Sequence, residues 1–523
     1  MTLFELVIAL LLAGAVLSAW ARRISVPYPA LLALAGAGLA LLPHVPSVTL
    51  DPELALALFV APVLLDAAFD SSPRDLKRYW RAVVGLAVAA VAVTIGAVAV
   101  VVRLCVPDLS WPAAIALGAI VAPPDAAAAT AVLKQMRPPH RLLVILEGES
   151  LFNDASALLV YRLAVGAAVA GSFSPWSALP VLAIVSVGSV LLAAVLSRLT
   201  LFVVGRVRDV ATSVIIQFIT TFGVWILADR LGLSSIITIV TYAILTARSA
   251  PARMPARLRI PSYAVWEVVV FVLNVLAFIL VGLQLRPILQ GLDRPQLLNY
   301  VATAAAVCAA AIVARMLWAL AYAVVARWTR RGDPSDAELA PRTSLRSAIA
   351  IGWSGMRGIV TLAAGLALPA AFPARDLILF TAFCVVLVTL VLQGGTLAPL
   401  MRLLRLEDDG TIEDEIRRAR AETARAGLEA LQGTGESGMT ALLTRKYEAR
   451  LRRADGAGPT ATGEVDDLPR YTEALRRARE AERRKLIELR AGDVIGDDAF
   501  HRVEEELDWA DLHEEAQRGL PGL

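Results

Sequence analysis

Long apolar runs separated by short polar segments fill the first four fifths of the chain. A helix needs about 20 mostly apolar residues to cross a bilayer, and we identify thirteen candidate runs. They lie at 3–20, 27–43, 52–69, 82–103, 111–133, 141–169, 178–201, 210–228, 233–247, 264–284, 299–326, 345–370 and 376–401. The pattern predicts an all-α polytopic membrane protein with about thirteen transmembrane helices.

The loops between these runs alternate in charge. One set of alternate loops carries 21 Lys and Arg residues, and the other set carries five. Because basic loops stay in the cytoplasm, we expect the N-terminus outside and the C-terminus inside the inner (cytoplasmic) membrane of a bacterium. No basic residue precedes the first run, and Arg22 and Arg23 follow it, so we expect a retained helix rather than a cleaved signal peptide.

The composition changes after residue 404. Residues 1–404 hold 30 Lys and Arg against 19 Asp and Glu, whereas residues 405–523 hold 20 against 28. We therefore expect a transmembrane domain at 1–404 and a charged helical cytoplasmic tail at 405–523. Opposite charges three or four positions apart predict tail helices at 413–431 and 471–490, with a Gly/Pro/Asp linker at 454–469. A solvated helical tail and a regulatory module both remain open.

Other function classes receive little support from the sequence. The basic residues do not cluster with aromatics, so we expect no nucleic-acid partner. The three cysteines lie inside apolar runs, as packing residues do. No Cys/His spacing indicates a bound metal, and we predict neither an enzyme nor a cofactor.

Three ionisable residues lie deep inside apolar runs. A charge at the bilayer centre costs at least a few kcal/mol, so such residues are functional candidates. At ~1.5 Å per residue, Asp125, Asp154 and Arg357 lie about 21, 20 and 18 Å from the ends of their runs. In a hydrocarbon core ~30 Å thick, all three fall near one middle layer. Two carboxylates and a guanidinium at matching depth predict a site.

Two runs carry helix-breaking residues beside these charges. Pro123 and Pro124 precede Asp125, which removes two amide donors and predicts unwound backbone with a free carbonyl at Pro124. A second interruption is predicted around Arg357, where three glycines cluster. They are Gly352, Gly355 and Gly358. Interrupted helices at corresponding positions of two inverted repeats indicate a transporter's ion site.

The sixth run places polar residues on adjoining helix faces. Ser150 and Asp154 share one face, and Glu149 and Asn153 share the next. Asp154 and Asp125 together form a hard oxygen site that suits a small cation such as Na⁺. Because the same carboxylates can bind a proton instead, Na⁺ and H⁺ would compete for one site.

Several neighbouring residues admit more than one interpretation. We favour Glu149 as a structural partner of Arg357 over Glu149 as the proton carrier. Arg357 would neutralise the site or fasten the broken helix, and Asn153 would hold backbone or Arg357. Glu147 would line the entrance. Other intramembrane polar residues are interpreted as packing or interhelical hydrogen bonds; they are Asp66, Glu267, Asn274 and Arg315.

Five segments resemble the sodium/proton exchanger (NhaP/NHE) branch of the monovalent cation/proton antiporters. They occur in the family's order and cover roughly residues 3–404. They are FVAPVLLDAAF (59–69), GAIVAPPDAAAATAVL (118–133), ILEGESLFNDA (145–155), WEVVVFVLNVLAFILVGLQL (266–285) and WSGMRGIVTLAAGLALP (353–369).

The resemblance implies a homodimer that exchanges Na⁺ for H⁺ by alternating access, serving pH and sodium homeostasis. It implies that Asp154 is the main ion and proton carrier and Asp125 a second ligand. Glu149 and Ser150 would help in coordination, with Asn153 and Arg357 organising the site. An Asn-Asp pair, as at 153–154, goes with electroneutral exchange in this family.

The chain departs from the family at one position that matters for ion choice. Family members commonly have Thr-Asp-Pro where this chain has Pro124-Asp125-Ala126, so the threonine hydroxyl is absent and only the carbonyl of Pro124 remains. A K⁺/H⁺ or Li⁺/H⁺ antiporter is therefore the main alternative. A cation channel is disfavoured because the chain has no selectivity-filter repeat, and a membrane sensor leaves the paired carboxylates unexplained.

Overall fold

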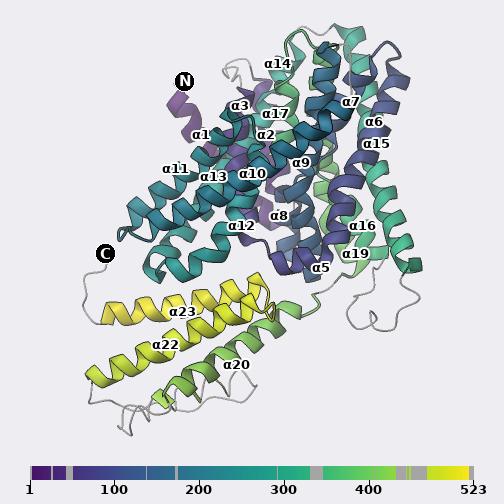
Figure 1. The fold of residues 1–523 in the computed structure, drawn as a ribbon. Coiled ribbons are helices and arrows are strands. Elements are labelled where there is room, and N and C mark those ends of the chain that lie inside the picture. The colour runs from purple at the N-terminus through teal and green to yellow at the C-terminus, as the bar shows by residue number, and fades with distance from the viewer. Residues whose placement is uncertain are drawn as a thin grey trace.

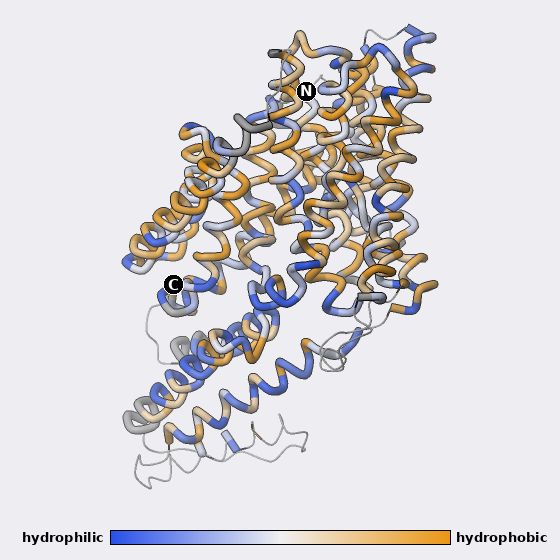
Figure 2. Tube along the Cα trace, turned by 45° about the vertical axis from the view of Figure 1, so that its right-hand side comes forward, coloured by the Kyte–Doolittle hydropathy of each residue, from blue (hydrophilic) through white to orange (hydrophobic). Residues whose placement is uncertain are grey.

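The computed structural model of the chain contains a large helical bundle with a group of three helices beneath it (Figure 1). The structure describes residues 3–24, 27–42, 51–136, 138–170, 175–290, 293–329, 345–406, 408–431, 443–444, 447–448, 451 and 468–517. All regular structure in these ranges is helical, as the sequence predicts. Figure 2 shows the bundle dominated by hydrophobic residues and the three-helix group by hydrophilic ones.

The bundle comprises nineteen α-helices, short or long, and three π-helical turns among the described residues. In chain order they are α1 (Leu3–Ile24), α2 (Tyr28–Ala40), α3 (Pro52–Ala55), η1 (Leu56–Val60), α4 (Ala61–Asp70), α5 (Pro73–Val84), η2 (Gly85–Ala90), α6 (Val91–Cys105), α7 (Trp111–Val121), α8 (Ala126–Met136), α9 (His140–Ala170), α10 (Pro175–Val204), α11 (Val210–Arg230), α12 (Ser235–Arg253), α13 (Ala256–Leu283), α14 (Leu285–Leu289), α15 (Arg294–Thr329), α16 (Leu345–Trp353), α17 (Ile359–Leu366), α18 (Arg375–Val388), η4 (Thr389–Gln393) and α19 (Gly394–Leu404).

Seven stretches among the described residues are long and apolar enough to cross a membrane. They are Pro52–Asp70, Pro73–Cys105, Ala183–Val204, Val210–Arg230, Ala256–Leu289, Arg294–Ala326 and Arg375–Leu404. Both helices predicted to be interrupted are broken: α7 ends before α8 begins at Ala126, and α16 ends before α17 begins at Ile359. Each half of a broken helix is shorter than a single membrane span, so the two broken helices are not among these seven stretches.

Local sequence signals set where several helices begin. Asp51, Ser72 and Ser110 precede α3, α5 and α7, and each accepts the backbone N–H three residues ahead. Such caps satisfy an amide that has no partner within the helix. A proline follows each cap within two positions, where its missing N–H costs nothing.

The helices pack as two bundles. The first bundle contains α1, α2, α4 and α10–α13, and the second contains α5–α9 and α15–α19. In the first bundle α2 and α13 touch backbone to backbone, because a Cβ at Gly36 would meet the carbonyl of Ile279 and one at Gly282 that of Ala33. Small residues permit such close approach between apolar helices. The candidate site residues lie mainly in the second bundle.

In the tail, three helices have both ends among the described residues, one more helix than the sequence indicates. They are α20 (Thr411–Leu431), α22 (Leu468–Ala491) and α23 (Asp497–Gln517). The charge pattern did not predict α23. Its many acidic residues flank a short apolar stripe, in which Phe500, Val503 and Leu507 pack against Leu486. Residues 454–467 of the expected linker lie outside the described residues, and its last two residues begin α22.

Candidate functional site

Each of the two broken helices supplies hydrogen-bond partners for the backbone of the other at its break. The N–H of Asp125, between α7 and α8, donates to the carbonyl of Met356 at 2.6 Å. Arg357, between α16 and α17, donates through Nε to the carbonyl of Val121 at 2.9 Å. Gly358 lies so close to the carboxylate of Asp125 that any Cβ there would overlap it. Non-helical backbone inside a membrane needs such internal partners, so the two breaks form one structure.

Arg357 fastens this crossing, one of the two roles expected for it. It is fully buried, and its backbone N–H donates to the hydroxyl of Thr389 at 3.0 Å. Its Nη1 donates to the carbonyl of Gly355, whereas its Nη2 has no hydrogen-bond partner among the described residues. The guanidinium therefore stabilises carbonyls that a continuous helix would have satisfied.

Glu149 does not pair with Arg357, so our preferred interpretation of its partner is wrong. Its carboxylate binds Arg315 of α15 through both oxygens, with Nη2 to Oε2 at 2.8 Å. Both side chains are buried. Arg315 passes close over Gly355, where a Cβ would block it. Arg315 thus makes the interhelical hydrogen bonds expected of it. Its partner is Glu149, the carboxylate that the sequence analysis pairs with Arg357.

Asn153 and Asp154 bring α9 to the broken helices. Asn153 is fully buried and donates from Nδ2 to the carbonyl of Pro124 at 2.8 Å, which confirms that it holds backbone. Its Oδ1 has no partner among the described residues. Asp154 follows in a buried position, close enough to Asp125 for their charges to interact. Ser150 lies one turn earlier on α9 and is partly buried. The structure therefore gathers the predicted oxygen donors into one region.

A cavity of about 780 Å³ lies between the two bundles, and its wall includes residues of α4, α9 and α10–α13. Glu147 lines it, as expected for an entrance residue. Asp66, Glu267 and Asn274 also line it. Tyr28, which no sequence motif singled out, lies on the cavity wall and interacts electrostatically with Asp125. Neither Asp125 nor Asp154 is part of the cavity wall, so Tyr28 is what connects the cavity with the carboxylates.

Comparisons with known proteins agree with these features. Residues 7–403 match the family model described as sodium/hydrogen exchanger, transmembrane. An uncharacterised Na⁺/H⁺ exchanger of Mycobacterium tuberculosis is 28% identical over 96% of this chain and 94% of its own. A sodium, potassium, lithium and rubidium/H⁺ antiporter of Bacillus subtilis is 30% identical over 66% of this chain and 53% of its own. The solved structure of a sodium proton antiporter from Methanocaldococcus jannaschii has a TM-score of 0.57 at 18% identity, covering 75% of this chain and all of that one.

Proposed function

The chain belongs to the sodium/hydrogen exchanger family, and we propose that it is a secondary active transporter that exchanges Na⁺ for H⁺ across the membrane. The observation that carries this proposal is the pair Asp125 and Asp154 at the crossing of two broken helices, beside a cavity whose wall residue Tyr28 interacts with Asp125. Na⁺ and H⁺ are its substrates, and lipid is its surroundings. It is a transporter and not an enzyme.

In the proposed cycle Asp154 is the carrier. It binds Na⁺ together with Asp125 while the site faces one side, and the second bundle then moves against the first. Na⁺ leaves on the other side, and a proton takes its place on the carboxylate. Ser150, Glu149 and the carbonyl of Pro124 would assist in coordination, and Asn153 and Arg357 would keep the site in shape.

The charges of the buried residues favour one-for-one exchange. The charge of Glu149 is neutralised by Arg315. The remaining charges of the site are those of Asp125, Asp154 and Arg357. Two ionised carboxylates and one guanidinium carry a net charge of −1, and binding either one Na⁺ or one H⁺ neutralises it. Because a net charge inside the membrane is costly, both loaded forms should cross more easily than the empty one. This supports electroneutral antiport by alternating access.

The proposal includes an arrangement in the membrane. Residues 1–404 would form a thirteen-helix exchanger domain built from inverted repeats, with the N-terminus outside. Residues 405–523 would form a cytoplasmic tail. We place the protein in a bacterial inner membrane as a homodimer that serves sodium and pH homeostasis. The charge of the loops supports this orientation.

Ion choice leaves a second candidate open, namely K⁺/H⁺ or Li⁺/H⁺ antiport. Two observations favour considering it. Pro124 replaces the family's common threonine, which removes a hydroxyl ligand. The relative from Bacillus subtilis is named for sodium, potassium, lithium and rubidium.

The test is cation-driven proton flux in proteoliposomes, comparing Na⁺, K⁺ and Li⁺. We expect Na⁺ to drive flux in the wild type and Asp154→Asn to abolish it. Asp108→Asn, which neutralises an exposed carboxylate in a loop, is the matched control and should leave flux unchanged. Flux that survives Asp154→Asn would place the ion path elsewhere. Cation movement without proton movement would indicate a channel.

A further inference from the structure

The tail is fastened firmly to the first bundle. Arg259 of α13 binds Asp508 of α23 through two hydrogen bonds, Nε to Oδ2 at 2.8 Å and Nη2 to Oδ1 at 2.6 Å. Its Nη1 lies 2.9 Å from the carboxylate of Glu504. All three side chains are buried. Nearby, Arg490 donates to the carbonyl of Ala247 in α12 at 3.2 Å. Because arginine stays charged at all relevant pH values, the pair of Arg259 and Asp508 holds in acidic and alkaline conditions alike. The other carboxylate of this anchor, Glu504, lies 3.4 Å from Nδ1 of His501.

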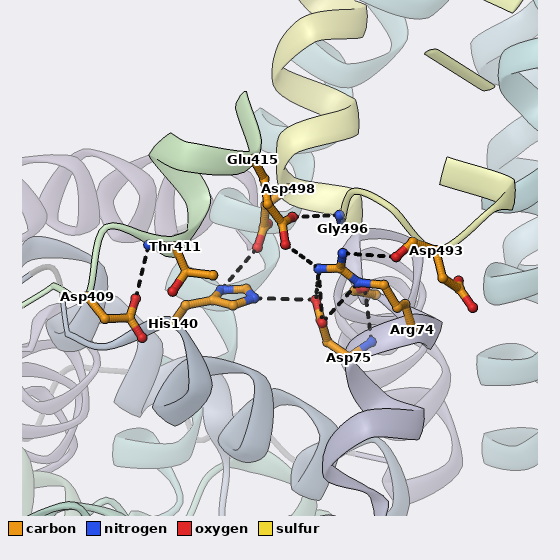
Figure 3. Close-up of polar contacts among 10 residues, drawn as sticks. Arg74, Asp75, His140, Asp409, Thr411, Glu415, Asp493, Gly496 and Asp498 are labelled. Carbon is orange, nitrogen blue, oxygen red and sulfur yellow. Dashed lines mark hydrogen bonds and ion pairs between the residues drawn. The ribbon is translucent and has the colours of Figure 1, made fainter. Parts of the chain in front are cut away.

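The tail also contacts the second bundle, through the polar network drawn in Figure 3. Arg74 of α5 binds Glu415 of α20 at 2.7 Å, and Glu415 accepts the N–H of Gly496 at 2.7 Å. His140 begins α9, with Nδ1 lying 3.5 Å from Oδ2 of Asp498 in α23. Its Nε2 lies 3.3 Å from Oδ2 of Asp75. His140 is buried, whereas Asp498 is half exposed. This second anchor contains a group that titrates near neutral pH.

Tail residues also form part of the cavity wall. They include Ile412 of α20 and Asp498, His501 and Glu505 of α23. Phe69 of α4 and Tyr263 of α13 line the same cavity, and the ring of Phe69 stacks on His501 with centroids 6.3 Å apart. Tail residues therefore contact both bundles beside the cavity.

We propose that α23 is a latch that holds the two bundles together while His140 is protonated and frees them when His140 loses its proton. The latch deepens the proposed function, because it acts only if transport requires the bundles to move against each other. A docked tail would slow this movement and narrow the access to the cavity. The anchor at Arg259 would keep the released tail beside its docking surface.

The charges around His140 set the direction of the switch. Asp75 of α5, Asp498 of α23 and Glu415 of α20 face it, while Arg74 binds Asp75 and Glu415, and His501 lies near Asp498. Burial lowers the pKa of His140, but the hydrogen bond to Asp75 and the charges of Asp498 and Glu415 outweigh burial and raise it above its ordinary value.

Asp75 stays beside His140 when the tail is released, whereas Asp498 and Glu415 leave with the tail. Because these two tail charges favour the protonated imidazole, docking takes up a proton, and the stabilisation from His140 is present at low pH and is lost as the pH rises through the pKa of docked His140. The latch should therefore be closed in mildly acidic conditions and open in alkaline ones. With the tail in the cytoplasm, this direction stops proton entry when the cytoplasm is already acidic.

The test compares His140→Gln and Asp498→Asn with the wild type in Na⁺-driven proton flux at saturating Na⁺. A partly exposed ion pair contributes up to about 1 kcal/mol, which corresponds to a two- to five-fold effect. We expect each variant to raise flux about two- to five-fold near pH 6 and to leave it unchanged near pH 8.5, so that the ratio of acid to alkaline flux rises. Asp498 is half exposed, so its replacement should not disturb folding.

Asp414→Asn is the matched control, because among the described residues Asp414 forms its ion pair with the exposed Arg417 one turn away on α20. This variant should preserve the wild-type ratio of flux near pH 6 to flux near pH 8.5. Equal ratios in the wild type, His140→Gln and Asp498→Asn would overturn the latch.

A second measurement does not depend on transport. Spin labels would be attached through Lys77→Cys on α5 and Trp509→Cys on α23, both exposed positions, in a chain lacking its three native cysteines. The distance between the labels should lengthen and spread as the pH rises, and Asp498→Asn should weaken this dependence on pH. A distance that is independent of pH would overturn the latch. If no cation drives flux in the wild type, the proposed function fails, while the label distances still test the switch.

Discussion

The buried pair of Glu149 and Arg315 gives a prediction whose size follows from the structure. The two side chains are 1% and 2% exposed and form a two-pronged contact. Arg315 also donates to the carbonyl of Ile351 at 3.2 Å. Removing one partner leaves an uncompensated buried charge, which typically costs about 3–5 kcal/mol. We therefore expect Arg315→Met to destabilise the protein by about that amount.

The same reasoning predicts that a double replacement recovers most of the loss. Glu149→Leu combined with Arg315→Met removes both charges and fills the space with apolar side chains. Exchanging a buried ion pair for apolar residues of similar volume is often neutral or stabilising. We expect the double variant to lie within about 1–2 kcal/mol of the wild type, and each single variant to be clearly worse. The measurement is thermal unfolding of purified protein in one lipid mixture, followed by tryptophan fluorescence.

Transport by the double variant then decides between the two roles of Glu149. Because Arg315 binds both oxygens of Glu149, we expect Glu149 not to carry the proton. The stable double variant should therefore retain Na⁺-driven proton flux, at a higher Na⁺ concentration because an assisting ligand is lost. A double variant as unstable as Arg315→Met would refute the energetic reasoning. A stable double variant without flux would instead show that Glu149 takes part in carrying the proton.

Two further predictions concern the carboxylates directly. Gly358→Ala should abolish flux while the protein still folds, because the added methyl group would displace Asp125. The control is Gly395→Ala, whose added methyl group would meet open space. Retained flux in Gly358→Ala would contradict the close approach of Gly358 to Asp125. The acid side of the pH profile should move down by up to about one pH unit for each tenfold increase in Na⁺, since the two ions compete for one site. A profile that does not move with Na⁺ would argue against simple competition.

Hydrophobic patterning predicted the positions of most helices but not where some of them begin. The expected run 210–228 became α11, and 376–401 became the continuous stretch from α18 to α19. The run 82–103, by contrast, belongs to a helix that begins at Pro73. Its first turns carry Arg74, Asp75 and Lys77, so hydropathy alone excludes them. The cap at Ser72 followed by Pro73 is the signal that could have found this start.

The sequence could not show which arginine pairs with Glu149, because it gives only the depth of each side chain in the membrane. The rise per residue gives the height of a side chain in the membrane, and both Arg315 and Arg357 are intramembrane arginines. Which of them faces Glu149 depends on how α9, α15 and α16 are rotated about their axes. That rotation follows from packing contacts such as Arg315 over Gly355. The backbone breaks were predictable because prolines and glycines act locally.

Charge explains why the tail docks where it does, although the sequence alone did not pair the residues. The loops on the tail side of the bundle hold most of the basic residues, and residues 405–523 carry an excess of acidic ones. Arg74 and Arg259 lie in segments predicted to be basic loops, at the starts of α5 and α13, and each binds tail carboxylates. The asymmetry that we use to orient the protein therefore also supplies the attraction between its two parts. Attraction between net charges brings the tail to this face, but only buried contacts such as Arg259 with Asp508 fix its position. Once α23 is fixed there, Asp498 reaches His140, and a general electrostatic attraction becomes a contact that depends on a single proton.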